Sequence, residues 1–312
     1  MKRKIHIGLS LILIIVLGIS VIPLVHPSPS FAVLGTQSTS QSTFDAGLDS
    51  PSYYLINAQN QEVLLAQNEA IQRPPASTVK LLTGLVAMQT LKEDDVVKVG
   101  EEVNIENSTL GLKPGDTILV KDLLTALFLP SANDAAVALA VKAKGSVPAF
   151  VEAMNQYAHQ LGCDSSNFQT PNGLPASDQY STARDLAKIA SEFIQNETLM
   201  KYVEKQEGKV EWTTSSGLKR SIIVHNLNEF LGIYPGVEGL KTGTTSEAGQ
   251  CLVTYITRPD GNLILVLLGS KNRYHDTKNL LDQGMAIVRT KAALRNLGSS
   301  PESMVQASGF FQ

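Results

Sequence analysis

Residues 74–80 read PPASTVK and continue without a break into LLTGLVAM, residues 81–88. The two prolines favour an extended entry, and the apolar run after them has the length and composition of a buried helix. We expect this helix to begin near Ser77. Ser77 and Lys80 then lie one turn apart on the same face of the helix.

The pairing of Ser77 with Lys80 is the pattern of a nucleophile and its base. A serine hydroxyl attacks poorly until a neighbouring group removes its proton, and a lysine kept from water can be that group. The unpaired backbone N–H groups of a helix start also favour developing negative charge. Because a serine at a helix start followed by lysine is often only a cap and a solvated charge, this tetrad needs support from the rest of the chain.

The composition indicates a globular protein with a mildly acidic body. The chain has 312 residues, of which 43% are hydrophobic and 18% charged, with a formal net charge of −3. Residues 2–4 are all basic and no acidic residue precedes Asp45, so no basic stripe in the body suggests a nucleic-acid partner. The five histidines and two cysteines form no cluster with metal-ligand spacing, and we expect neither a metal nor another cofactor.

The N-terminus has the layout of an export signal. Residues 1–32 contain the basic residues 2–4, an apolar run over residues 7–25 and the sequence SFA at residues 30–32, which fits a cleavage site. An uncleaved membrane anchor is the alternative, because the apolar run is nearly long enough to cross a bilayer. In both cases we expect the body outside the cytoplasm, either secreted or anchored, with residues 33–50 as a flexible tether.

The two cysteines, Cys163 and Cys251, could pair after export. An even count permits one disulfide without requiring it, and two buried free thiols are the interpretation we favour.

The order of expected elements indicates an α/β fold of the α+β kind. Strands at both chain ends surround a helical middle, so we expect the two ends to join in one antiparallel sheet with the helical segment as an inserted lobe. We expect one domain over residues 51–292, a loose tail over residues 293–312, and the site between lobe and sheet. The expected strands cover residues 52–57, 62–67, 210–214, 218–224, 251–257 and 263–268, with a small β excursion at 96–120, and the expected helices cover 123–129, 134–143, 147–161, 182–194 and 276–288.

Three short motifs occur in a fixed order along the chain. They are S-x-x-K at residues 77–80, S-A-N at residues 131–133 and K-T-G at residues 241–243. This is the motif set of class A β-lactamases and penicillin-binding proteins. Longer strings extend the match: LPSANDAA at 129–136, TPNGL at 170–174, YSTARDLA at 180–187 and GLKTGTT at 239–245.

With these strings, residues 52–288 resemble the low-molecular-mass penicillin-binding proteins, the serine-type D-alanyl-D-alanine carboxypeptidases of the peptidase S11 kind. The resemblance implies a β-lactamase/transpeptidase-like fold. It also implies that Ser77 forms an acyl-enzyme, with Lys80 as its base and Ser131 relaying a proton to the departing amine. Backbone N–H groups of Ser77 and Thr244 would form the oxyanion hole.

The same resemblance implies which residues bind the substrate. Asn133 would bond the peptide backbone, and Lys241 with Thr242 would hold the free C-terminal carboxylate. Gly243 would leave room for the peptide along the strand edge. The implied partners are peptidoglycan stem peptides ending in D-Ala-D-Ala, and β-lactams that mimic them. Arg273 could also help to hold the carboxylate, but we interpret it as a surface salt bridge and leave it outside the predicted site.

Related functions remain as alternatives. A class A β-lactamase carries a further E-x-x-L-N motif, and none occurs between Asn133 and Lys241. Many carboxypeptidases of this family continue past the catalytic domain into a β-rich domain and an amphipathic anchor. This sequence stops soon after the expected helix at residues 276–288, and the D,D-endopeptidases are short in the same way. A non-catalytic protein that binds penicillin or wall peptide would carry a damaged motif, and none is damaged here. We therefore favour a carboxypeptidase and keep the endopeptidase and the binding protein as alternatives.

Overall fold

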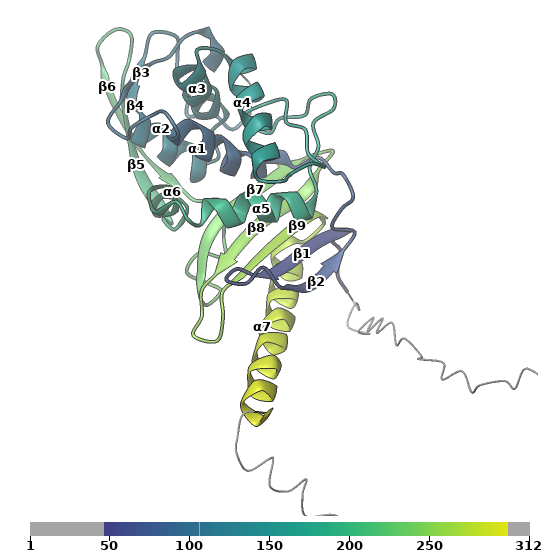
Figure 1. The fold of residues 1–312 in the computed structure, drawn as a ribbon. Helices are drawn as coiled ribbons and strands as arrows, with labels where there is room; N and C mark the ends of the chain where they lie inside the picture. Colours follow the sequence, from purple (N-terminus) through teal and green to yellow (C-terminus); the bar gives the residue numbers. More distant parts are fainter. Residues whose placement is uncertain (1–46, 106, 299–312) are drawn as a thin grey trace, which may run out of the picture. The chain divides into compact units, whose positions relative to one another are not determined.

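The computed structural model describes residues 47–105 and 107–298 (Figure 1). The expected signal at residues 1–32, the tether up to residue 46 and residues 299–312 of the expected tail lie outside these ranges. Among the described residues, no helix is both long and apolar enough to cross a bilayer.

A five-stranded antiparallel sheet joins the two ends of the described chain, as expected. Its strand order is β2-β1-β9-β8-β7, so the N-terminal hairpin pairs with the C-terminal one through β1 and β9. Strand β7 lies at one edge and pairs only with β8 within the sheet. The strands are β1 (Ser52–Asn57), β2 (Val63–Gln67), β7 (Val237–Thr245), β8 (Gly249–Ile256) and β9 (Leu263–Ser270).

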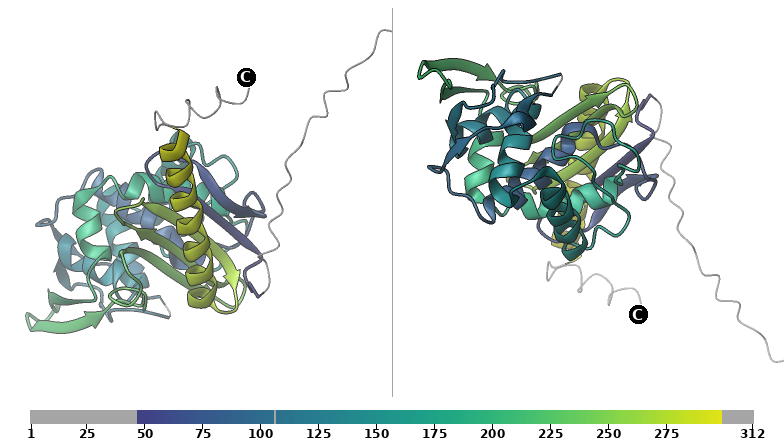
Figure 2. Two further views of the ribbon diagram at one scale, coloured as in Figure 1. Left: turned by 90° about the horizontal axis from the view of Figure 1, so that it is seen from below. Right: turned by 90° about the horizontal axis from the view of Figure 1, so that it is seen from above.

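Both faces of this sheet are covered by helices. Helix α7 packs on one face, and α5 packs on the other with the helical lobe beyond it (Figures 1 and 2). Strand β9 shows the consequence, because its residues alternate between the two cores. Ile264, Val266 and Leu268 belong to the core on the lobe side, while Leu263, Leu265 and Leu267 belong to the core under α7.

The helices largely follow the expected pattern, with small differences at their ends. A 3-10 turn (Ala76–Val79) leads into α1, so Ser77 lies on this turn and Lys80 begins the α-helix. Helix α7 begins earlier and ends later than expected, and residues 293–298 are therefore helical. The helices are α1 (Lys80–Met88), α2 (Val120–Phe128), α3 (Asn133–Lys144), α4 (Val147–Gln160), α5 (Ala183–Phe193), α6 (Glu197–Val203) and α7 (Arg273–Gly298).

Helix α6 was not expected from the sequence, although its start carries a recognisable cap. Oδ1 of Asn196 accepts a hydrogen bond from the backbone N–H of Leu199 at 3.0 Å. Thr182 caps α5 in the same way, accepting from the N–H of Asp185 at 3.0 Å. Such caps satisfy N–H groups that have no partner within the helix. Helix α6 has only seven residues, which is too short for a clear periodic pattern.

The inserted lobe contains a second sheet that the sequence pattern did not assign. Its order is β3-β4-β5-β6, and it joins strands before and after the helices. Strand β4 pairs with β5 at Ile118 and Trp212, which are far apart in the chain. The expected excursion at residues 96–120 contributes only two short strands. The four strands are β3 (Val96–Lys98), β4 (Thr117–Leu119), β5 (Glu207–Thr213) and β6 (Lys219–His225).

The loop at residues 171–173 packs directly against the 3-10 turn that carries Ser77. Gly173 has φ of +79°, and a Cβ there would lie 2.1 Å from the backbone oxygen of Ala76. Only glycine tolerates both the left-handed backbone and this close approach. Gly145, after α3, has the same φ of +79° but no neighbouring atom within 4 Å of a Cβ.

These two glycines give a matched test of the contact. Gly145→Ala should lower the free energy of unfolding by about 1 kcal/mol, because only the backbone is strained. Gly173→Ala should cost about 1–3 kcal/mol more, since the added methyl also overlaps the Ser77 turn. Urea unfolding of both variants measures the difference, and equal losses would contradict the packing described here.

Candidate active site

Ser77 and Lys80 lie together at the start of α1, as their spacing predicts. Nζ of Lys80 lies 2.9 Å from Oγ of Ser77. The turn that presents Ser77 is held by the hydroxyl of Thr78, which donates to the backbone oxygen of Pro75 at 2.6 Å. Ser77 is half-buried, whereas Lys80 has no exposed surface. A lysine amine is thus shut away from water beside a reachable hydroxyl.

The other neighbours of this amine are two carbonyl oxygens. Nζ of Lys80 donates to Oδ1 of Asn133 at 2.8 Å and to the backbone oxygen of Asn172 at 2.6 Å. Both oxygens can only accept. Nζ also donates to Oγ of Ser77, and the Ser77 hydroxyl donates to the backbone oxygen of Asn172 at 3.4 Å. Once the amine loses a proton, the two carbonyls can keep its remaining hydrogens, and its lone pair can then accept from the hydroxyl of Ser77.

Burial and a neighbouring positive charge favour the neutral form of Lys80. Burial lowers the pKa of Lys80 well below its ordinary value, and the positive charge of Lys241 lowers it further. The carboxylate of Asp134 acts in the opposite direction and raises the pKa of Lys80. Because desolvation is the largest of these effects, Lys80 loses its proton far more readily than a surface lysine.

The side chain of Asn133 makes hydrogen bonds within the protein, and its predicted contact with the substrate stays a prediction. Its Oδ1 faces Lys80, and its Nδ2 donates to the backbone oxygen of Asn107 at 2.9 Å. Both ends of the amide are therefore engaged. The side chain fixes the amine of Lys80, a role that the motif alone does not reveal.

The hydroxyl of Ser131 is buried without a hydrogen-bond partner among the described residues. Ser131 is 5% exposed and has a positive φ of 62°. An unpaired buried hydroxyl is costly, which makes it a reasonable donor or acceptor for a bound substrate.

Strand β7 brings the K-T-G motif alongside Ser77. A Cβ on Gly243 would lie 2.9 Å from the backbone nitrogen of Ser77 and 3.0 Å from Cβ of Ala76. Gly243 therefore makes room for the Ser77 turn, and the room that it was predicted to leave for the peptide stays a prediction. Thr244 follows and is exposed, so the strand becomes accessible at this point.

Lys241 is the second buried lysine of the site. It is 1% exposed, and its Nζ donates to the backbone oxygen of Thr242 at 3.0 Å. Burial, followed by the charge of Arg273, lowers the pKa of Lys241 to about 7. Lys241 therefore loses its proton near neutral pH, and an anionic ligand would stabilise its charged form.

Arg273 lies beside the K-T-G strand, and its interpretation as a surface salt bridge is wrong. It makes no ion pair with an acidic side chain in the described part of the chain. Instead Nη1 donates to the backbone oxygens of Gly243 at 3.1 Å and Cys251 at 3.0 Å, and Nη2 donates to Oγ1 of Thr244. These bonds hold a cation at the accessible end of β7. Its position at the start of α7 gave no sign of this, because the contacts are to atoms of the distant strands β7 and β8.

The TPNGL segment was noticed in the sequence but given no role. The backbone oxygen of Asn172 accepts from Lys80, and the backbone oxygen of Pro171 accepts from Oγ1 of Thr83 at 2.6 Å. Thr83 is fully buried one turn after Lys80. A polar residue on the buried face of α1 was the available signal that another segment bonds there.

The two cysteines are free and buried, as favoured from the sequence. Burial raises the pKa of Cys163 to about 12 and that of Cys251 to about 11. Both thiols therefore stay protonated near neutral pH and are poor nucleophiles. Within residues 47–105 and 107–298, no group of three or more histidine, cysteine or acidic side chains could hold a metal ion.

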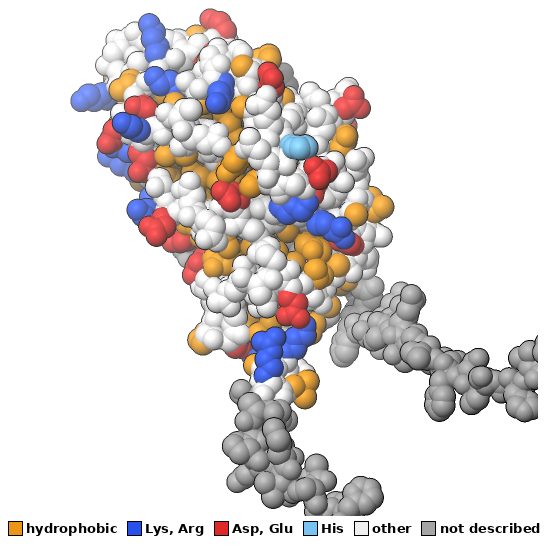
Figure 3. Space-filling view, in the orientation of Figure 1, with side chains coloured by type: hydrophobic (Ala, Val, Ile, Leu, Met, Phe, Trp, Pro, Cys, Tyr) orange, Lys and Arg blue, Asp and Glu red, His pale blue; other side chains and the backbone are white. Residues whose placement is uncertain are grey.

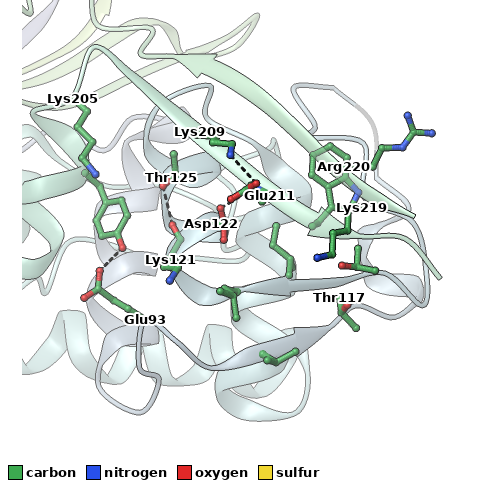
Figure 4. A pocket seen from close by; sticks show the side chains of 16 residues that line it. Glu93, Thr117, Lys121, Asp122, Thr125, Lys205, Lys209, Glu211, Lys219 and Arg220 are labelled. Atoms are coloured by element: carbon green, nitrogen blue, oxygen red, sulfur yellow. Dashed lines mark hydrogen bonds and ion pairs between the residues drawn. The ribbon is translucent and has the colours of Figure 1, made fainter. Parts of the chain in front are cut away.

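A groove of about 750 Å³ lies elsewhere on the lobe, between α2 and the second sheet (Figure 4). None of its lining residues belongs to the predicted site. Its charged groups are partly paired, with Lys209 and Glu211 2.8 Å apart, and Oδ1 of Asp122 accepting from the N–H of Glu211 at 2.9 Å. Basic and acidic side chains are interspersed over the lobe on the face that Figure 3 shows.

Comparison with known proteins places this geometry in context. The family model described as D-alanyl-D-alanine carboxypeptidase, peptidase S11, matches residues 36–272. The carboxypeptidase DacC of Escherichia coli is 33% identical over 85% of this chain and 68% of its own length. DacF of Bacillus subtilis is 32% identical over 77% of this chain and 63% of its own length. The chain thus spans about two thirds of the length of these curated relatives.

A solved structure is similar over nearly its whole length. The DD-transpeptidase of Streptomyces strain K15 superposes with a TM-score of 0.73, at 30% identity, over 77% of this chain and 98% of that one. The antiparallel sheet with an inserted helical lobe is therefore the fold of this DD-transpeptidase as well, as the motifs implied.

Proposed function

Because this chain belongs to the D-alanyl-D-alanine carboxypeptidase family, peptidase S11, we propose that it removes the terminal D-alanine from peptidoglycan stem pentapeptides. The observation that carries the proposal is the buried amine of Lys80, 2.9 Å from the hydroxyl of Ser77. A serine with a neutral lysine beside it is equipped for acyl transfer. No other pair of side chains in the proposed site offers this chemistry.

In the proposed acylation, Lys80 takes the proton of Ser77 as Oγ attacks the carbonyl between the two D-alanines. The backbone N–H groups of Ser77 and Thr244 stabilise the negative oxygen that forms. Collapse of this intermediate breaks the amide bond, and the departing D-alanine needs a proton on its nitrogen. Ser131 passes that proton on, since its unpaired hydroxyl can accept from one group and donate to another. Water then hydrolyses the ester and frees Ser77.

The free carboxylate of the substrate binds at the accessible end of β7. Lys241 and Arg273 supply positive charge there, and Thr242 supplies a hydroxyl. The peptide backbone extends along the edge of β7, which pairs with β8 on its other side. Asn133 holds Lys80 in this proposal, and the second N–H of its amide remains to bond the peptide backbone.

The setting of the reaction follows from the substrate. We place the catalytic domain at residues 51–292, exported by the signal at residues 1–32 and working outside the cytoplasm, either secreted or anchored. β-Lactams mimic the terminal dipeptide and acylate Ser77. Cleavage of cross-links by the same serine is the alternative activity, and the test below separates the two.

The substrate test uses a mixture of free pentapeptide and cross-linked muropeptide dimer, followed by mass spectrometry. The protein should remove one alanine from the pentapeptide and leave the dimer intact. Ser77→Ala should abolish this turnover together with covalent labelling by penicillin, because it removes the hydroxyl that forms the acyl-enzyme.

Two results would contradict this proposal. Conversion of dimer to monomers with the pentapeptide intact would identify an endopeptidase. Turnover that survives in Ser77→Ala would rule out the serine mechanism altogether.

The two buried lysines predict a bell-shaped pH dependence of kcat/KM for the pentapeptide. Lys80 must be neutral to act as a base, so activity should rise with pH through its lowered pKa. Lys241 must be charged to bind the carboxylate, so activity should fall as pH rises above about 7 in the free enzyme. A steady-state pH profile measures both limbs.

Lys241→Arg is the control that assigns the alkaline limb. A guanidinium stays charged at every pH of interest, so the alkaline limb should move to higher pH while the acid limb stays in place. An alkaline limb that does not move in this variant would show that Lys241 is not the group responsible.

A further inference from the structure

Asp134 is a fully buried carboxylate that the proposed mechanism does not use. It follows Asn133 in the first turn of α3 and has no exposed surface. Its two oxygens accept four backbone N–H bonds, from Leu110 and Gly111 at 2.9 Å each, Leu112 at 3.1 Å and Ala135 at 2.9 Å. Three of these bonds reach across to the loop at residues 107–112.

The loop held by Asp134 has an unfavourable backbone. Asn107 and Ser108 are consecutive and have positive φ values of 61° and 40°. Residues other than glycine persist in such conformations only where the surroundings hold them. The bonds from the carboxylate of Asp134 to residues 110–112 are suited to this, because bonds to a charged acceptor are stronger than those between neutral groups.

The strained residues of this loop in turn hold Asn133. The backbone oxygen of Ser108 accepts from the N–H of Asn133 at 2.7 Å, and that of Asn107 accepts from its Nδ2 at 2.9 Å. The second bond sets which end of the amide faces Lys80. If the loop moved, the amide could turn and present N–H groups to the amine, where they would compete with the hydroxyl of Ser77 for the lone pair.

We propose that Asp134 is a positioning residue for acylation: it fastens the loop at residues 107–112, and the loop orients Asn133 so that Oδ1 holds the amine of Lys80 beside Ser77. The inference rests on the proposed function, because it assigns Asp134 a part in the same reaction. Asp134 touches neither the nucleophile nor its base and acts through backbone atoms and one amide.

The charge of Asp134 makes this role distinguishable from simple structural support. Lys241 on β7 and Asp134 on α3 are the charged groups that shift the pKa of Lys80, and Asp134 raises it. Asp134→Asn removes that effect, so the free amine should persist to lower pH. The variant should therefore acylate more slowly on the pH plateau, although at lower pH a larger fraction of its Lys80 is neutral.

The test measures the rate of acylation by a fluorescent penicillin between about pH 5 and pH 9. Asp134→Asn should lower the plateau rate about 10- to 100-fold, as expected for a misplaced catalytic group, and move the acid limb to lower pH. The matched control is Asp122→Asn. Asp122 is also a buried aspartate in the first turn of a helix and accepts one backbone N–H, but it lies in the groove of Figure 4.

Asp122→Asn should acylate within about twofold of the parent protein, with the acid limb in place, because its loss does not reach Lys80. If Asp134→Asn does not fold, Asp134→Ser replaces it. The serine also lacks the charge and is too short to bond residues 110–112, so the same result is expected. A plateau rate within about threefold of the parent, or an equal loss in Asp122→Asn, would overturn the inference. Failure of the parent protein itself to react would instead contradict the proposed function.

Discussion

The amine of Lys80 is the point on which the site depends. Burying a lysine is expensive, and burial lowers the pKa of Lys80 well below its ordinary value. The buried amine needs hydrogen-bond partners. Asn133, Asn172 and Ser77 supply these from separate parts of the chain, so the fold has to bring these segments to one point.

The two layers of the protein meet that requirement by close backbone approaches. The turn carrying Ser77 lies between Gly243 on the edge strand and Gly173 in the loop at residues 171–173, and a side chain at either glycine would collide with it. The sheet supplies a rigid edge because β9, at its centre, is buried on both faces. The lobe supplies Asn133, held by the loop that Asp134 fastens. Substitutions at these contacts should therefore change the position of Ser77 and with it the rate of acylation.

The sequence predicted those parts of the site that depend on local spacing. The pairing of Ser77 with Lys80 follows from the helix repeat, and the common sheet of the two chain ends follows from the order of strands and helices. The hydrogen bonds to backbone oxygens could not be predicted. The carbonyl of Asn172 and the carbonyls that accept from Arg273 have no signature in the sequence. The second sheet was missed for a related reason, since the pairing of β4 with β5 joins strands separated by most of the lobe.

The lowered pKa of Lys80 can be measured directly. In protein labelled with carbon-13 at the lysine side chains, the ε-carbon signals titrate with pH, and Lys80→Met and Lys241→Met identify the two buried residues. The account predicts that the signal lost in Lys80→Met titrates well below the ordinary lysine value of about 10.4. A Lys80 signal that titrates together with those of the surface lysines would contradict it.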